Sequence, residues 1–474
     1  MNRFKLFIEN FLVYGLGGMI SKIVPFIMLP IVTRMMPNTF YFGLNDISTV
    51  VVSFGQALAI MGMYDALFRM FFENSSQEYK KEICSTALTF TFITSVIIFI
   101  AMIILRKPLA AVFFSNRKYA NLLCLSAMSI LIGATNSIVS APTRMRNQRR
   151  IYLITNFLSP VISYSISIPL LLKGYYIIAL PLASILAALS VEIIFIVLNR
   201  KWFSFKINKR YLKDMLIIAL PLVPNFLVYW IFNSSDRLMI SKLIGTEWNG
   251  IYAVGAKIGQ ISQLIYTAFA GGWQFFAFST MKDNDQVKMT SNIFEYLGII
   301  TFSTGMLMAS LSKVVFKLLF SEAYLAGYIV MPYLFVSPLL LMLYQVVVNQ
   351  FLVVKKTWPS VIILGVGAIT NVLINALLIP AIGIEGAAIG TFLGYVAAIT
   401  GVIIVLSKMK LVSISGKFYF CIILFIGFSL AWRLVFLNNY VICLLLSVVV
   451  IGIYVGMYRK DLFKVLKKDE VNRR

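Results

Sequence analysis

Histidine is absent from this 474-residue chain. The commonest general base, proton relay and metal ligand of proteins is therefore missing. Cysteine is scarce: Cys84, Cys124, Cys421 and Cys443 lie far apart in apolar runs and form no Cys-x-x-Cys pair. That spacing argues against a disulfide framework or a metal centre and favours small buried hydrophobic side chains. We expect neither a metal site nor a cofactor.

Charge is also in short supply, at 13% of the residues, and acidic residues are the rarer kind. Lys and Arg number 42 against 18 Asp and Glu, whereas 60% of the chain is hydrophobic. A soluble domain is only about 45–50% apolar. The predicted fold class is therefore an all-α polytopic membrane protein. Its basic excess is typical of membrane anchoring, with a basic cavity for an anionic substrate as the alternative, and it does not indicate nucleic-acid binding.

Apolar stretches of the length needed to cross a bilayer as a helix, about 20 residues, recur about fourteen times. The segments between them are short, so we expect no soluble domain. The stretches lie at about 10–33, 43–66, 83–105, 120–143, 151–172, 175–198, 213–236, 248–278, 292–312, 325–353, 359–380, 384–406, 417–437 and 440–458.

The first twelve stretches contain an internal repeat with an offset of about 207 residues. Any one match is weak, but several in the same order indicate a duplicated six-helix unit in parallel orientation, as in some transporters. This predicts an N-terminal lobe at 1–205, a second lobe at 206–410, and two extra helices with a basic tail at 411–474. The matched pairs are 33–43 with 241–250, 73–82 with 282–290, 105–115 with 311–321, and Gly174 with Gly383.

Charged residues inside membrane helices normally face protein or a water-filled cavity. Lys22 and Lys257 fall near the middle of their predicted spans, whereas Asp236 and Arg237 are adjacent at the end of another. Neighbouring helical residues do not face each other, so Asp236 and Arg237 each need another partner. Structural helix–helix seams are the alternative to a binding site. Our candidate substrate-binding residues are Lys22, Arg34, Arg69, Asp236, Arg237, Lys242 and Lys257. A local pair of Asp65 with Arg69 is the competing role for Arg69.

Three segments resemble those of one transporter family. "NSSDRLMISKLIGTEWNGIYAVGAKI" (233–258) carries the Asp-Arg pair followed by Gly-Ile-Tyr and a lysine. "LPIVTRMMPNTFYFGLNDIS" (29–48) carries Thr-Arg before an aromatic–glycine pair, and "MYDALFRMFFENSSQEYKKEICSTAL" (63–88) is also similar. The family is the oligosaccharide (Wzx-type) flippases of the multidrug/oligosaccharidyl-lipid/polysaccharide exporter superfamily. The chain departs from it in the turn "PNTFYFG", which is longer than usual.

The resemblance implies two six-helix lobes around a V-shaped cavity lined by spans 1, 2, 7 and 8. It also implies that a lipid-linked oligosaccharide, carried on polyprenyl diphosphate, is moved from the cytoplasmic to the outer leaflet by alternating access. Membrane lipids, a coupling ion (Na⁺ or H⁺) and a monomeric state belong to the same expectation, as does a role in cell-surface polysaccharide biosynthesis. Lys and Arg at the cavity wall suit the diphosphate.

Two other classes of function compete with this interpretation. A multidrug or organic-cation antiporter could share the fold, but it would need deep carboxylates, and both mid-span charges here are lysines. A membrane enzyme would need a catalytic loop outside the bilayer. The loops are short and contain no acid–base constellation, so we expect no enzymatic activity.

Loop charges predict the topology in the cytoplasmic membrane. With the N-terminus inside, the inner segments hold about 29 Lys and Arg and the outer segments about 11, which places both termini and the 199–210 loop in the cytoplasm. A cysteine introduced at Lys206, or in the C-terminal tail, should resist a membrane-impermeant thiol reagent in intact cells. Labelling of both positions from outside would contradict this topology.

Overall fold

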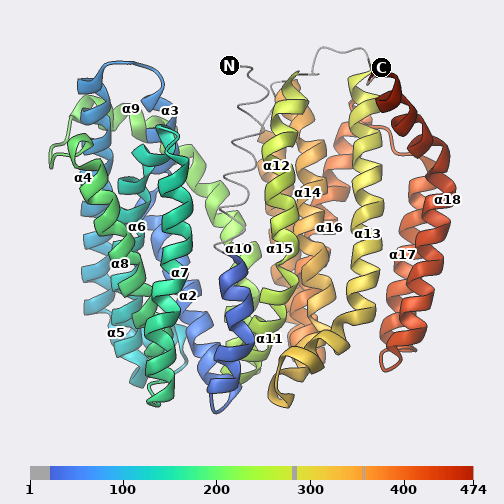
Figure 1. The fold of residues 1–474 in the computed structure, drawn as a ribbon, viewed down its shortest axis with the longest axis horizontal. Helices are drawn as coiled ribbons and strands as arrows, with labels where there is room; N and C mark the ends of the chain where they lie inside the picture. The colour runs from blue at the N-terminus through green and yellow to red at the C-terminus, as the bar shows by residue number, and fades with distance from the viewer. Residues whose placement is uncertain (1–21, 280–284, 355, 357, 473–474) are drawn as a thin grey trace. The chain divides into compact units, whose positions relative to one another are not determined.

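A computed structural model describes residues 22–279, 285–354, 356 and 358–472, except for the side chains at 268, 271–272, 274–279 and 460–472. The described residues form helices without strands (Figure 1). Twelve of these helices are long and apolar enough to cross a membrane. The predicted all-α membrane fold is confirmed. The first expected span, 10–33, falls largely outside the described residues, which are helical from 22 to 35.

The chain packs as two compact units, one comprising residues up to 254 with 372–387, the other 255–371 with residues from 388 onward. The lobe boundary expected at 205/206 stays a prediction. Helix α11 belongs in part to each unit. The first unit contains α2 (Thr39–Ile60), α3 (Met63–Phe71), α4 (Gln77–Ile104), α5 (Arg106–Phe113), α6 (Ala120–Met145), α7 (Arg149–Leu172), α8 (Ala179–Asn199), α9 (Lys209–Ala219), α10 (Val223–Leu243) and the start of α11 (Thr246–Gly259), with 3-10 turns η1 (Arg117–Tyr119), η2 (Arg200–Trp202) and η3 (Leu220–Leu222).

Helix α6 is the centre of the first unit, where it packs against α2, α4 and α8. Ser48 of α2 and Ser126 of α6 share a buried hydrogen bond of 2.8 Å. Asn199, at the end of α8, donates to the carbonyl of Val139 in α6 at 2.9 Å. These contacts satisfy polar groups that the bilayer could not.

Helix α14 has the same central place in the second unit, packing against α12 and α13. It is the most buried of the candidate spans, and α6 is the most buried span of the first unit. The two are equivalent members of the predicted repeat. The second unit contains α12 (Ser262–Ser279), α13 (Gln286–Leu319), η4 (Glu322–Ile329), α14 (Met331–Val353), α17 (Gly416–Leu434) and α18 (Tyr440–Asn472), and most of α15 (Trp358–Ile382) and α16 (Ile384–Lys408).

The two extra helices are attached to α13 by a buried carboxylate. Glu295 accepts hydrogen bonds from the Ser415 backbone at 2.6 Å, from the Ser415 hydroxyl at 2.8 Å and from the Tyr458 hydroxyl at 2.8 Å. Phe302 stacks on Phe425 of α17, with ring centroids 4.7 Å apart. Glu295 therefore holds the start of α17 and a point on α18 against the same helix.

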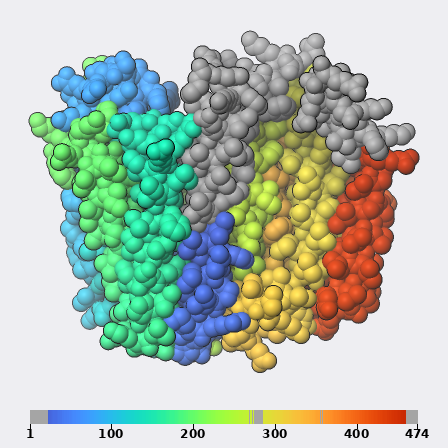
Figure 2. Space-filling view, in the orientation of Figure 1, coloured from blue at the N-terminus to red at the C-terminus, as the bar shows by residue number. Residues whose placement is uncertain are grey.

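Large apolar side chains cover the outward surfaces of each unit. Figure 2 shows the green surface of α7 and α8 on one unit and the red surface of α17 and α18 on the other. Exposed residues there include Phe157 of α7, Ile193 of α8 and Leu430 of α17. Such faces are normal for helices in contact with hydrocarbon.

Three expected spans are interrupted in the structure: 43–66 at Met61 and Gly62, 213–236 at the 3-10 turn Leu220–Leu222, and 248–278. The stretch 248–278 is divided into α11 and α12, with the break between Gly259 and Ser262. A Cβ at Gly259 would come within 3.0 Å of the Leu334 backbone, so the chain passes close to α14 at this point. Residues before and after the break therefore do not share one continuous helical face.

Two glycines that the predicted repeat pairs have similar backbone conformations. Gly174 and Gly383 were matched at equivalent helix–helix turns, and both have positive φ, +84° and +70°. Glycine adopts this left-handed conformation without the Cβ penalty and commonly follows the last turn of a helix. Both turns therefore place a glycine in the left-handed conformation after the last turn of a helix.

Candidate functional site

Helices α2 and α11 cross at their first turns through a pair of glycines. Both helices begin with Thr-x-x-x-Gly, Thr39 to Gly43 in α2 and Thr246 to Gly250 in α11. A Cβ at Gly43 would overlap the Thr246 carbonyl and lie 2.8 Å from the Gly250 nitrogen. No residue other than glycine fits this approach, which resembles the small-residue crossings of membrane helices.

The contact is symmetric with respect to the repeat. A Cβ at Gly250 would overlap the Thr39 carbonyl and lie 3.1 Å from the Gly43 nitrogen. Each glycine thus packs on the threonine that is equivalent to its own helix start. Contacts of this reciprocal kind are expected where two copies meet on a two-fold axis. The crossing is therefore the place where the two predicted copies touch through matched residues.

A buried ion pair lies beside the glycines. Arg237 of α10 donates from Nη1 to Asp46 Oδ1 of α2 at 3.2 Å. Asn249 of α11 donates to the Gly43 carbonyl at 3.1 Å and to Asp46 Oδ2 at 3.3 Å. The Asp46 side chain is 1% exposed and that of Arg237 is 12% exposed. Three helices are therefore joined through one carboxylate, and we call Asp46, Arg237 and Asn249 the polar latch.

Asp236 has a different partner from its neighbour. Its carboxylate accepts a hydrogen bond from the Tyr252 hydroxyl of α11 and one from the Arg237 backbone N–H at 2.8 Å. Adjacent residues on α10 therefore contact two different helices, Arg237 reaching α2 and Asp236 reaching α11. This explains how two charges are tolerated side by side at this depth.

The polar latch is incompletely satisfied. Arg237 Nε and Asn249 Oδ1 are buried and have no hydrogen-bond partner in the described part of the chain. Leaving such an atom unpaired costs about 1–3 kcal/mol. Of the two neighbouring carboxylates, Asp46 accepts from the Arg237 guanidinium and Asp236 from the Arg237 backbone N–H. The network therefore joins three helices while two of its buried polar atoms stay unpaired among the described residues.

The other candidate residues lie on the surface. Lys22, Arg34, Lys242 and Lys257 are exposed. Arg69 contacts Glu73 at 3.8 Å, with both side chains more than half exposed. Arg69 thus pairs with Glu73 rather than with Asp65, the local partner considered above. An ion pair as exposed as this one contributes little stability. The structure thus brings Asp236 and Arg237 together with Asp46, and leaves the other five outside this network. Substrate binding by any of the seven stays a prediction.

Sequence reasoning missed Asp46, Asn249 and Tyr252. The repeat offered one signal, because it placed the segments ending in Gly43 and Gly250 in register. Asp46 follows Gly43 by three residues, and Asn249 directly precedes Gly250. An acid three residues after a helix-crossing glycine lies on the same face and is a natural partner for an intramembrane arginine.

Comparison with known proteins identifies the family. A family model described as polysaccharide biosynthesis protein matches residues 31–328. The chain belongs to this family. An uncharacterized membrane protein of Methanocaldococcus jannaschii is 27% identical over 274 residues. That match spans 54% of this chain and 54% of the relative, so the chain covers about half the relative's length.

Solved structures confirm the exporter fold of this polysaccharide biosynthesis family member. The lipid II flippase MurJ in an inward closed conformation has a TM-score of 0.72, with 14% identity, covering 95% of this chain and all of that one. An inward-facing multidrug resistance MATE family transporter of the MOP superfamily has a TM-score of 0.62, with 14% identity, covering 83% and 98%. These likenesses show that the chain shares its fold with the flippase MurJ and with the MATE transporter.

The polar latch predicts a coupled effect on stability. Replacing Asp46 with Asn leaves the buried Arg237 guanidinium without its partner on α2, and breaking such a pair costs about 3 kcal/mol. The double variant Asp46→Asn/Arg237→Gln should recover part of that loss, because the unpaired guanidinium is gone and Asp236 keeps its hydrogen bonds from the Tyr252 hydroxyl and the backbone N–H of residue 237. Denaturant unfolding of the purified protein measures both effects, and Arg69→Gln serves as the control with an exposed pair. A double variant no more stable than Asp46→Asn would contradict the assignment.

Proposed function

We propose that this protein flips a lipid-linked oligosaccharide, carried on polyprenyl diphosphate, across the cytoplasmic membrane for cell-surface polysaccharide export. Membership of the polysaccharide biosynthesis family supports the pathway. The exporter fold supports movement of a substrate by alternating access rather than enzymatic turnover. The charge distribution supports an anionic headgroup.

One observation carries the choice of substrate charge. In the described membrane helices the carboxylates are withdrawn into protein, whereas the mid-span lysines are not. Asp46, Glu192, Asp236 and Glu295 are 1%, 7%, 4% and 5% exposed. Lys22 and Lys257 are exposed, and the exposed described carboxylates inside expected spans are Asp65, in the short helix α3, and Asp214, in α9. A lysine at mid-membrane is tolerated where it meets water rather than lipid, so these two suit the path of an anion.

The same observation weighs against the cation antiporter. An organic cation needs an accessible carboxylate deep in the membrane, and a buried, hydrogen-bonded acid such as Glu295 does not supply one. A diphosphate that leaves water needs cationic partners to replace its lost hydration. Lysines at the surface can supply that replacement.

Alternating access is the mechanism that the helix crossing suits. The glycines bring α2 and α11 together at the end that the charge bias places outside. When the polar latch separates, the predicted copies can part there by rocking as units. The monomeric state, the coupling ion (Na⁺ or H⁺) and both cytoplasmic termini belong to the same proposal.

The test removes the two mid-span charges. Lys22→Gln/Lys257→Gln should lower the flipping rate about tenfold or more, since each lost contact with a charged phosphate is worth about 1.5–3 kcal/mol. Lys257→Arg should keep part of the activity because the charge is retained. The measurement is the amount of lipid-linked oligosaccharide accessible on each leaflet, normalised to protein amount.

Lys107→Gln is the matched control, because Lys107 is an exposed lysine in the short helix α5. It should flip at the normal rate. If the Lys22→Gln/Lys257→Gln variant also transports the lipid-linked oligosaccharide at the normal rate, the two lysines do not bind its headgroup. The result would then favour the organic-cation antiporter.

A further inference from the structure

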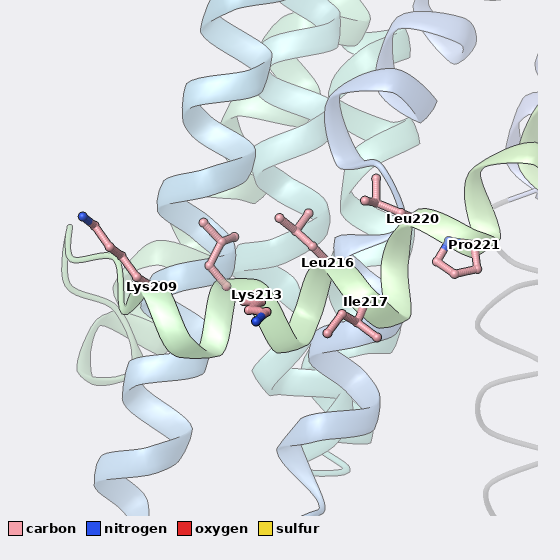
Figure 3. Close-up of a pocket in the computed structure, with 7 residues that line it drawn as sticks. Lys209, Lys213, Leu216, Ile217, Leu220 and Pro221 are labelled. Atoms are coloured by element: carbon pink, nitrogen blue, oxygen red, sulfur yellow. The ribbon is translucent and has the colours of Figure 1, made fainter.

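Helix α9 is set apart from the membrane helices that it precedes. The stretch Lys209–Leu243 has the composition of one 35-residue span, which as a straight helix would measure roughly 50 Å. Pro221 and Pro224 divide it, since proline cannot continue the helical hydrogen-bond ladder. Figure 3 shows α9 running across the direction of the neighbouring helices of its unit. It therefore has the orientation of an interfacial helix rather than of a span.

One face of α9 packs on its own unit. Met215 and Ala219 are fully buried in a cluster that includes Met63 and Leu67 of α3. Tyr211 meets Tyr79 of α4 edge-on, with ring centroids 5.2 Å apart. This face accounts for the attachment of α9 to α3 and α4 and leaves its opposite face uncovered.

The opposite face forms a shallow groove of about 430 Å³. Lys209 and Lys213 line one end, and Leu216, Ile217, Leu220 and Pro221 line the other (Figure 3). At 100° per residue these positions and Leu212, which also lines the groove, fall on one side of α9, with Arg210 at the edge of that side and Asp214 beyond it. The groove thus changes from cationic to apolar along its length.

We propose that this groove binds an anionic glycerophospholipid of the cytoplasmic leaflet. The two lysines would contact the phosphate, and the apolar end would take the start of an acyl chain. An interfacial helix with lysines on its polar side and large apolar residues beside them is the pattern that binds anionic bilayers. The preceding loop, with Lys201 and Lys206, adds positive charge near the same end.

A folded protein partner fits the groove less well. An α-helix of this length measures roughly 16 Å, whereas a stable protein interface buries about 800 Å² on each side. A lipid headgroup with part of an acyl chain matches the size of the groove. It also matches the order of the lining, which is cationic at one end and apolar at the other. Occupation would hold α9, the link between the two predicted copies, at the membrane surface.

The experiment uses the full chain in vesicles containing photoactivatable phosphatidylglycerol, with photoactivatable phosphatidylcholine as the neutral comparison. Phosphatidylglycerol should label the peptide 209–221 preferentially. Lys209→Gln/Lys213→Gln should reduce that labelling about tenfold, the size expected for two lysine–headgroup contacts. Ile217→Asn should also reduce it, by making the apolar end polar.

Lys107→Gln/Lys118→Gln is the matched control, because it removes the same charge from exposed residues outside α9 and its preceding loop. It should leave labelling within about twofold of normal, since only the diffuse surface potential changes. Melting temperatures of all variants separate loss of the site from loss of the fold. Binding is measured without transport, so the outcome is independent of the flipping test.

Four results would overturn the proposal. Equal labelling by phosphatidylcholine would mean bilayer contact without an anionic site. Equal loss in both double variants would mean long-range charge only. Displacement by polyprenyl phosphate but not by phosphatidylglycerol would assign the groove to the substrate's tail. A crosslink from 209–221 to a second copy would make it a self-interface.

Discussion

A membrane interior offers no water to a polar group, and this constraint is met most tightly where α2, α10 and α11 converge. Gly43 and Gly250 let two backbones touch, and Arg237 must then find its counter-charge inside the protein. It finds Asp46, on a helix nearly 200 residues away in sequence. The proposed rocking of the two copies depends on this one contact, because it is where matched residues of both copies meet.

The same constraint gives the buried carboxylates a structural role and leaves the exposed lysines for the proposed transport. Carboxylates inside the described helices serve as internal partners: Asp46 holds Arg237, Asp236 accepts from Tyr252, and Glu295 anchors the two extra helices. Lys22 and Lys257 remain on the surface. Buried carboxylates together with exposed lysines suit the binding of an anion. The packing of the helices is thereby linked to the proposed diphosphate substrate.

The sequence predicted those features of the fold that depend on local composition. Long apolar runs marked the spans, and the repeat matched Gly174 with Gly383, whose turns share a conformation. Tertiary pairing leaves a weaker trace: the residues next to Arg237 do not indicate its partner, and only the register of Gly43 with Gly250 points toward Asp46. The break in 248–278 was missed because it depends on the close approach of Gly259 to α14. The separate helix α9 could have been expected from Pro221 and Pro224, since the stretch they divide is too long for one bilayer.

The central claim is that the glycine crossing opens and closes during transport. Asn38 and Glu247 are exposed and flank the crossing, one at the start of α2 and one at the start of α11. Spin labels at these two positions, in vesicles that contain lipid-linked oligosaccharide, report the separation directly. The account predicts one short distance without substrate and a second, longer population during transport. A single unchanged distance while oligosaccharide is being flipped would contradict it.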